Sequence, residues 1–90
     1  MVIFLNKILV NIYVVSLGRS YDLFIPINIT GTQLLDLLQK ALISLSNENY
    51  IYQEKAFLLD RDTGYLINQN NTIKFSGIKN GSNLLLAHTT

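Results

Sequence analysis

The sequence predicts an α+β fold in which a β-sheet of four to five strands is covered on one face by a single helix. Residues 8–15 alternate with the two-residue period of a strand, whereas residues 30–45 carry leucines at the spacing of a helix. The apolar runs that follow are only a few residues long, which is typical of short strands. One helix and several strands in 90 residues predict a single domain, residues 1–90.

Two strands are predicted before the helix. The first covers residues 8–15, where β-branched side chains occupy alternate positions and Asn11 marks the polar face. The second covers residues 21–27, in which Asp22 marks the polar face. Pro26 has no N–H to donate to a neighbouring strand, so we expect this second strand at an edge of the sheet.

The start of the helix is the most specific local signal in the chain. Thr30 and Gln33 match a capping box, in which each side chain accepts a hydrogen bond from the backbone N–H of the other residue. Asp36 and Lys40 form an i,i+4 pair on the outer face, and the helix should end near residues 46–47. The stripe expected to form its apolar face consists of Leu34, Leu37, Leu38, Ala41, Leu42 and Leu45.

The chain after the helix is less regular. Residues 47–55 carry no clear signal. Residues 72–82 hold only Ile73, Phe75 and Ile78 as apolar anchors, which indicates a turn or one 3₁₀ turn. The remaining predicted segments are a strand at 56–60, a turn at 60–64, a short strand at 65–67 and a closing strand at 83–88.

Few residues could support catalysis or bind a metal ion. The chain has no cysteine, and His88 has no partner in the sequence that would make it a ligand or a base. Asp60 and Asp62 could form part of a calcium loop, but the later ligands are absent and both residue types are also common in solvated turns. We therefore expect no enzymatic activity, no cofactor and no metal site.

The charge distribution argues against a nucleic-acid partner. Seven basic and six acidic residues give a net charge of +1, and the basic residues are scattered singly rather than gathered in a stripe. Charged residues make up only 14% of the chain, so apolar surface should remain for a protein partner.

The N-terminal residues raise the question of targeting. The stretch "MVIFLNKILVNIYVV" is apolar, but it lacks a basic region ahead of the apolar run and a small-residue cleavage site. It is also too short and too interrupted to cross a membrane. We expect a cytoplasmic protein with no direct membrane insertion.

Two longer stretches resemble a known family. "SYDLFIPINITGTQLLDLL" and "GIKNGSNLLL" are similar to the YukD/EsaB family of ubiquitin-like proteins, which accompany WXG100 (ESX, type VII) secretion systems of Gram-positive bacteria. The similarity covers about residues 8–87 and leaves "MVIFLN", residues 1–6, as a possible N-terminal extension. It implies a ubiquitin-like β-grasp and a non-enzymatic accessory or regulatory role.

The β-grasp implied by this resemblance specifies how the sheet closes. Asn80–Gly81 then forms a tight turn rather than the tip of a hairpin, and it leads into a central strand that runs parallel to the first strand. The side chains expected to face the helix are Ile12, Val14, Leu23, Ile25, Ile27, Ile73, Ile78, Leu84 and Leu86.

The same fold leaves one face of the sheet open. Tyr13, Phe24 and Leu85 should point outward from three neighbouring strands and lie side by side as a protein-binding patch. The expected partner is a component of the secretion machine, either a membrane component or an FtsK/SpoIIIE-like ATPase. A homodimer, or cover by the chain's own "VIFL" segment, are the alternatives.

Other ubiquitin-like functions fit less well. A ubiquitin-like modifier or sulfur carrier needs a C-terminal Gly-Gly, and no Gly-Gly pair occurs in the sequence. A nucleic-acid-binding β-grasp is opposed by the scattered charges.

Overall fold

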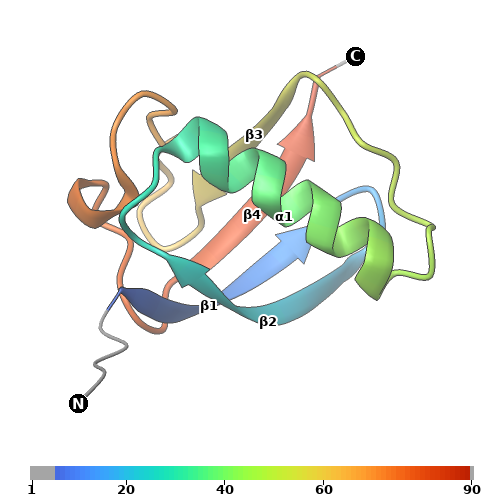
Figure 1. Ribbon diagram of the computed structural model, residues 1–90, viewed down its shortest axis with the longest axis horizontal. Helices are drawn as coiled ribbons and strands as arrows, with labels where there is room; N and C mark the ends of the chain where they lie inside the picture. The colour runs from blue at the N-terminus through green and yellow to red at the C-terminus, as the bar shows by residue number, and fades with distance from the viewer. Residues whose placement is uncertain (1–5, 90) are drawn as a thin grey trace.

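A computed structural model of the protein describes residues 6–89. It consists of one four-stranded sheet with a single helix lying across one of its faces (Figure 1). Of the possible N-terminal extension, only Asn6 lies within the described residues. The elements are β1 (Lys7–Val14), β2 (Arg19–Pro26), α1 (Gly31–Leu45), β3 (Ala56–Asp60), the 3₁₀ turn η1 (Ile73–Phe75) and β4 (Asn83–His88).

The strands are arranged in the order β2-β1-β4-β3. β1 pairs antiparallel with β2 and parallel with β4, and β4 pairs antiparallel with β3. The predicted mixed sheet, with the last strand at its centre and parallel to the first, is confirmed. β2 lies at an edge, as the position of Pro26 predicted.

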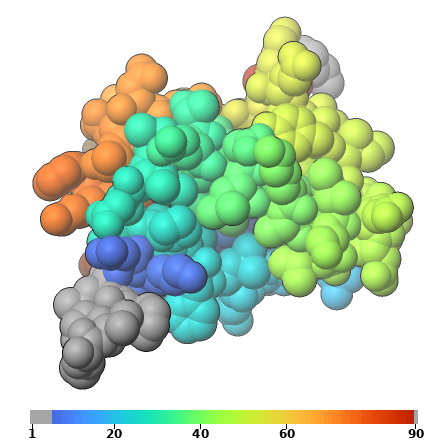
Figure 2. Space-filling model, in the orientation of Figure 1, coloured from blue at the N-terminus to red at the C-terminus, as the bar shows by residue number. Residues whose placement is uncertain are grey.

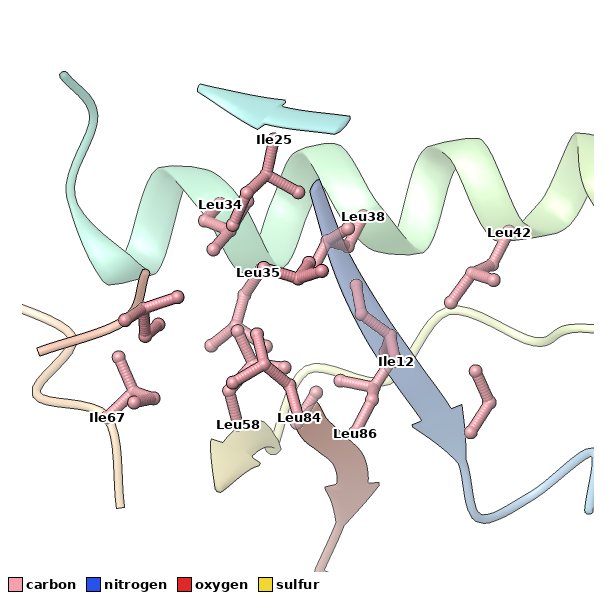
Figure 3. Close-up of a cluster of buried hydrophobic side chains, with 14 of the residues drawn as sticks. Ile12, Ile25, Leu34, Leu35, Leu38, Leu42, Leu58, Ile67, Leu84 and Leu86 are labelled. Carbon is pink, nitrogen blue, oxygen red and sulfur yellow. The ribbon is translucent and has the colours of Figure 1, made fainter. Parts of the chain in front are cut away.

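The hydrophobic core lies between α1 and the covered face of the sheet. Figure 3 shows Ile12, Leu84 and Leu86 on the sheet, pointing toward the leucines of the helix. In space-filling form, α1 and the chain that follows it cover most of this face (Figure 2). The fully buried side chains are Ile12, Ile25, Leu34, Leu42, Leu58, Ile73, Leu84, Leu86, Val10 and Val14. Each contributes about 1.5–3 kcal/mol through its removal from water.

The buried face of α1 differs from the predicted stripe. Leu37 and Leu45 are 47% and 51% exposed, whereas Leu35 and Gln39 are buried. The reason is the path of residues 47–55, which return along the side of the helix that carries Gln39 and cover it.

Gln39 holds this returning segment in place. Its Oε1 accepts hydrogen bonds from the Tyr50 hydroxyl, at 2.7 Å, and from the Gln53 N–H, at 2.8 Å. Its Nε2 donates to the Gln53 carbonyl at 3.1 Å. Burial raises the pKa of Tyr50, so its hydroxyl stays a protonated donor to a higher pH than a tyrosine in water. Asn47 and Glu48, both with positive φ, turn the chain out of the helix end.

The backbone N–H groups of the first turn of α1 are hydrogen-bonded in two ways, through the predicted capping box and through the loop at residues 69–71. The Thr30 hydroxyl accepts from the Gln33 N–H, and the Gln33 side chain accepts from the Thr30 N–H. The Gly31 and Thr32 N–H groups donate to carbonyls of residues 69–71 at 3.0 Å each. All four N–H groups at this helix end therefore have partners.

Two expectations for the chain between β3 and β4 need correction. Residues 65–67 do not form a strand, because only Leu66 makes a bridge, to Leu59. Phe75 is 75% exposed rather than an anchor, because η1 turns only Ile73 into the core. Ile78 is buried as expected.

The Asn80–Gly81 turn docks on β1. The Asn80 Oδ1 accepts from the Leu9 N–H at 2.8 Å, and the Gly81 N–H donates to the Leu9 carbonyl at 2.8 Å. Gly81 has a φ of +90°, which favours glycine over any residue with a Cβ. The turn thus extends the contact between β1 and the chain entering β4, instead of closing a hairpin.

Candidate protein-binding surface

The face of the sheet opposite α1 is built from alternate residues of each strand. In β1, Val10, Ile12 and Val14 are buried toward the helix, so Leu9 and Tyr13 point the other way. Figure 1 shows α1 on one side of the sheet only. We call this second side the open face.

Four apolar side chains form a continuous row across the open face. Tyr13 of β1 pairs with Leu85 of β4, Leu85 pairs with Leu59 of β3, and Leu59 bridges to Leu66. Leu66 is 64% exposed, and the other three are half-buried. We call Tyr13, Leu59, Leu66 and Leu85 the open-face patch.

A basic side chain borders the patch. The guanidinium of Arg61 lies over the Tyr13 ring, 5.4 Å from its centroid, which is within the range of a cation–π contact. Aromatic residues and arginine are both enriched at protein interfaces. The pair therefore combines an apolar surface with a planar cation.

A polar row lies next to the patch. Asn11 pairs in register with Asp22 on one side and with Asn83 on the other. The Asn11 side chain donates to the Asp22 carboxylate at 2.9 Å, and the Asn83 side chain donates to that of Asp62 at 3.1 Å. The Asn83 backbone N–H also donates to Asp62, and these bonds hold the pKa of Asp62 below its usual value.

This polar row separates the three residues that the sequence predicts as one patch. Tyr13 and Leu85 are direct neighbours, as expected. Phe24 is 69% exposed but pairs with Leu9, on the far side of the row formed by Asn11. The structure therefore brings two of the three residues together and places Phe24 elsewhere on the open face.

Leu59 and Leu66 complete the open-face patch, and the sequence prediction does not include them. Alternation within "AFLLD" places Leu59 on the same side as Phe57. Which side that is depends on the register with β4, and no local pattern reveals it. Leu66 joins the patch through a single β-bridge to Leu59, and one bridged residue produces no alternating pattern in the sequence from which its position could be predicted.

The other residues considered for catalysis or metal binding are Asp60, Asp62 and His88. The buried Asp60 accepts a hydrogen bond from the Asp62 N–H within the turn after β3. His88 is half-buried at the end of β4. Within residues 6–89 no group of three or more His, Cys, Asp or Glu residues is placed to hold a metal ion, and no pocket is found. The described part of the chain also has no helix with the length and apolar character needed to span a membrane.

The comparison with known proteins decides the fold. No family model and no curated protein matches the sequence. The ubiquitin-like domain of EccD5 from Mycobacterium xenopi superposes with a TM-score of 0.73 at 13% identity, covering 92% of this chain and 94% of that one. The protein has a ubiquitin-like β-grasp fold.

The same ubiquitin-like fold occurs in very different assemblies. A chain of the MycP5-free ESX-5 inner membrane complex, State II, matches with a TM-score of 0.66 at 14% identity, over 94% of this chain and 21% of that one. A chain of the toluene 4-monooxygenase HD complex with 4-bromobenzoate matches with a TM-score of 0.72 at 13% identity, over 92% and 99%. Likeness of fold alone therefore assigns no function, because function depends on the chemistry of the residues at the surface.

Proposed function

We propose that this protein is a non-enzymatic, cytoplasmic accessory or regulatory component of a bacterial type VII (WXG100/ESX) secretion system. In this proposal it belongs to the YukD/EsaB family and acts by binding another protein through the open face of its sheet. The observation that carries the proposal is the open-face patch beside Arg61. Three observations support the choice of system: the motif resemblance, the likeness in fold to the EccD5 domain, and the likeness in fold to part of one chain of the ESX-5 complex.

The composition of the patch favours a protein as its partner. Its four apolar residues come from three strands and a loop, so they form a broad surface rather than a slot. Contiguous apolar surface of this kind commonly marks interaction sites, and tyrosine and arginine are frequent energetic anchors there. The proposed partner is a membrane component of the secretion machine or its FtsK/SpoIIIE-like ATPase.

The test measures binding to the purified cytoplasmic domains of those components by calorimetry. Leu85→Asp introduces a carboxylate between Tyr13 and Leu59, and we expect it to weaken binding by about tenfold or more, as the loss of a central anchor does. Leu37→Asp is the matched control, because Leu37 is an exposed leucine on the helix, away from the open face. It should bind like the wild type.

Phe24→Asp shows how far the interface reaches. Binding that survives this change confines the contact to the open-face patch, whereas a loss shows that the interface crosses the polar row to Phe24. Circular dichroism establishes that each variant remains folded. Wild-type affinity in Leu85→Asp, or equal loss in Leu37→Asp, would contradict the proposal.

A further inference from the structure

The two edges of the sheet differ in whether their outward backbone groups are hydrogen-bonded. Along β3, Leu58 accepts from the Ile67 N–H at 2.9 Å and Asp60 donates to the Tyr65 carbonyl at 2.8 Å, so a loop closes that edge. No such loop lies along β2 within the described residues 6–89. β2 is therefore the open edge of the sheet in the described part of the chain.

The hydrogen-bond pattern of β1 shows which groups of β2 face outward. Odd-numbered residues of β1 bond toward β4, as the Asn11 N–H does to the Ser82 carbonyl, and even-numbered positions bond toward β2. In the unbroken register with β1, the β2 residues opposite those even positions are the odd-numbered ones. The N–H and C=O groups of Ser20, Asp22 and Phe24 consequently point away from the sheet.

Pro26 sets the limit of this edge. It is the next outward-facing position after Phe24, and its ring nitrogen carries no hydrogen. The proline costs the sheet no hydrogen bond, because that position faces solvent. The edge available for pairing therefore runs from Ser20 to Phe24, and each of its three outward-facing residues offers one donor and one acceptor.

The side chains along this edge specify the chemistry of an added strand. Asp22 is the central residue of the three and the only charged one. One oxygen of its carboxylate accepts from Asn11, which leaves capacity for a cross-strand cation. Phe24, 69% exposed, offers an apolar neighbour on the same face, and the half-buried Tyr21 and Leu23 line the other face.

We propose that the β2 edge binds an extended segment of a partner protein as a fifth strand, with a basic residue of that segment opposite Asp22. Opposite charges directly across a sheet are favourable, and like charges are not. A second copy of this chain fits less well: in the symmetric antiparallel register that uses all three outward residues, Asp22 would face the same residue of the other copy. The edge and the open-face patch are different surfaces, so this site is additional to the one proposed above.

The test follows backbone amide signals of the isotope-labelled protein by NMR during titration with a synthetic peptide, acetyl-Val-Thr-Val-Lys-Val-Thr-Val-amide. We expect saturable shifts and slowed hydrogen exchange at the N–H groups of Ser20, Asp22 and Phe24. The same peptide with a central Glu should bind about threefold more weakly or worse. A peptide N-methylated at its Lys and both Thr residues, whose N–H groups would face β2, should not bind, whereas N-methylation of its two central Val residues should be tolerated.

Four variants establish whether the peptide binds at the β2 edge. Asp22→Lys should reverse the preference, so that the Glu peptide binds better than the Lys peptide. Ser20→Pro removes one outward N–H and should weaken binding, whereas Ser20→Ala keeps that N–H and should not. Leu85→Asp should bind the peptide like the wild type, which distinguishes this site from the open-face patch.

Several outcomes would overturn the proposal. One is shifts confined to Tyr13, Leu59 and Leu85, and another is the absence of saturable shifts at millimolar peptide. A third is an unchanged preference in Asp22→Lys. Concentration-dependent shifts at Ser20, Asp22 and Phe24 without any peptide would replace the partner segment with a second copy of this chain.

Discussion

Two tyrosines show how differently a hydroxyl can be buried in this small core. The Tyr50 hydroxyl donates to Gln39 and helps to fix the segment after α1. The Tyr21 hydroxyl is buried with no hydrogen-bond partner among the described residues. The Arg19 guanidinium lies over the Tyr21 ring, 5.6 Å from its centroid, and so contacts the ring face rather than the hydroxyl. A buried polar group without a partner loses its hydration and gains nothing in exchange.

Removal of the Tyr21 hydroxyl should therefore not destabilise the protein. We expect Tyr21→Phe to leave the free energy of unfolding unchanged or to raise it by up to about 1 kcal/mol. Tyr50→Phe is the matched control and should lower it by about 1 kcal/mol, because Gln39 then loses a buried hydrogen bond. Urea unfolding monitored by circular dichroism measures both. A clear loss of stability in Tyr21→Phe would show that its hydroxyl has a partner.

At the scale of residues, the sequence predicts burial well where strands alternate and less well elsewhere. Val10, Ile12 and Leu84 are buried as their parity requires. Leu37 and Phe75 are exposed although they look like core residues, and Gln39 is buried although it looks like a surface residue. The exposure of these three residues depends on where irregular segments pack. The two-residue period of a strand and the 3.6-residue period of a helix carry no information about that packing.

At the scale of elements, the start of α1 is more constrained than a capping box requires. The loop at residues 68–71 packs directly against Gly31. A Cβ at Gly31 would lie 2.8 Å from the Asn68 carbonyl oxygen and 2.8 Å from the Gln69 Cα, both of them backbone atoms. The glycine is therefore needed for close approach and not for an unusual backbone angle.

Gly31→Ala tests this packing. Helix propensity alone favours alanine. The added Cβ, however, would clash with the backbone of residues 68–69, and this clash should lower the free energy of unfolding by about 1–3 kcal/mol. Ser44→Ala, at an exposed position of the same helix, should instead raise it by about 0.5 kcal/mol. Thermal and urea unfolding of the two variants provide the measurement, and a stabilised Gly31→Ala protein would refute the close approach.

The order and type of the elements were more predictable than their pairing. The sequence locates both N-terminal strands, the capped helix, β3 and β4 to within about two residues, because each has its own period or cap. Register is a property of two segments together. That is why Tyr13 and Leu85 could be predicted to share a face, while the displacement of Phe24 and the inclusion of Leu59 could not.

At the scale of the whole molecule, exposed carboxylates couple stability to pH. Hydrogen bonds from Tyr52 and Lys40 lower the pKa of Asp36, and those from Asn83 lower the pKa of Asp62. A carboxyl group with a lowered pKa in the folded state stabilises that state above its unfolded pKa. This contribution is lost as the pH falls below the ordinary value of 3.8 and through the lowered folded value.

The double variant Asp36→Asn and Asp62→Asn should therefore flatten the acid limb of the stability curve. We expect the melting temperature of the wild type to fall more than that of the variant between about pH 5 and about pH 2, with little difference in slope at higher pH. Scanning calorimetry at low ionic strength gives both curves. Parallel curves over the whole range would contradict this prediction, because they would mean that the two carboxyl groups have the same pKa in the folded and the unfolded protein.

The central β1–β4 pair also has a mechanical consequence. The two strands run parallel, with Asn11–Val14 in register with Asn83–Leu86, so β1 begins and β4 ends on opposite sides of the molecule (Figure 1). Tension between Lys7 and His88 therefore slides the strands along each other and loads their hydrogen bonds together. An antiparallel pair pulled open from one end would instead release its bonds one at a time. The Asn80–Gly81 contact with Leu9 lies in line with the same pair, so it shares that load.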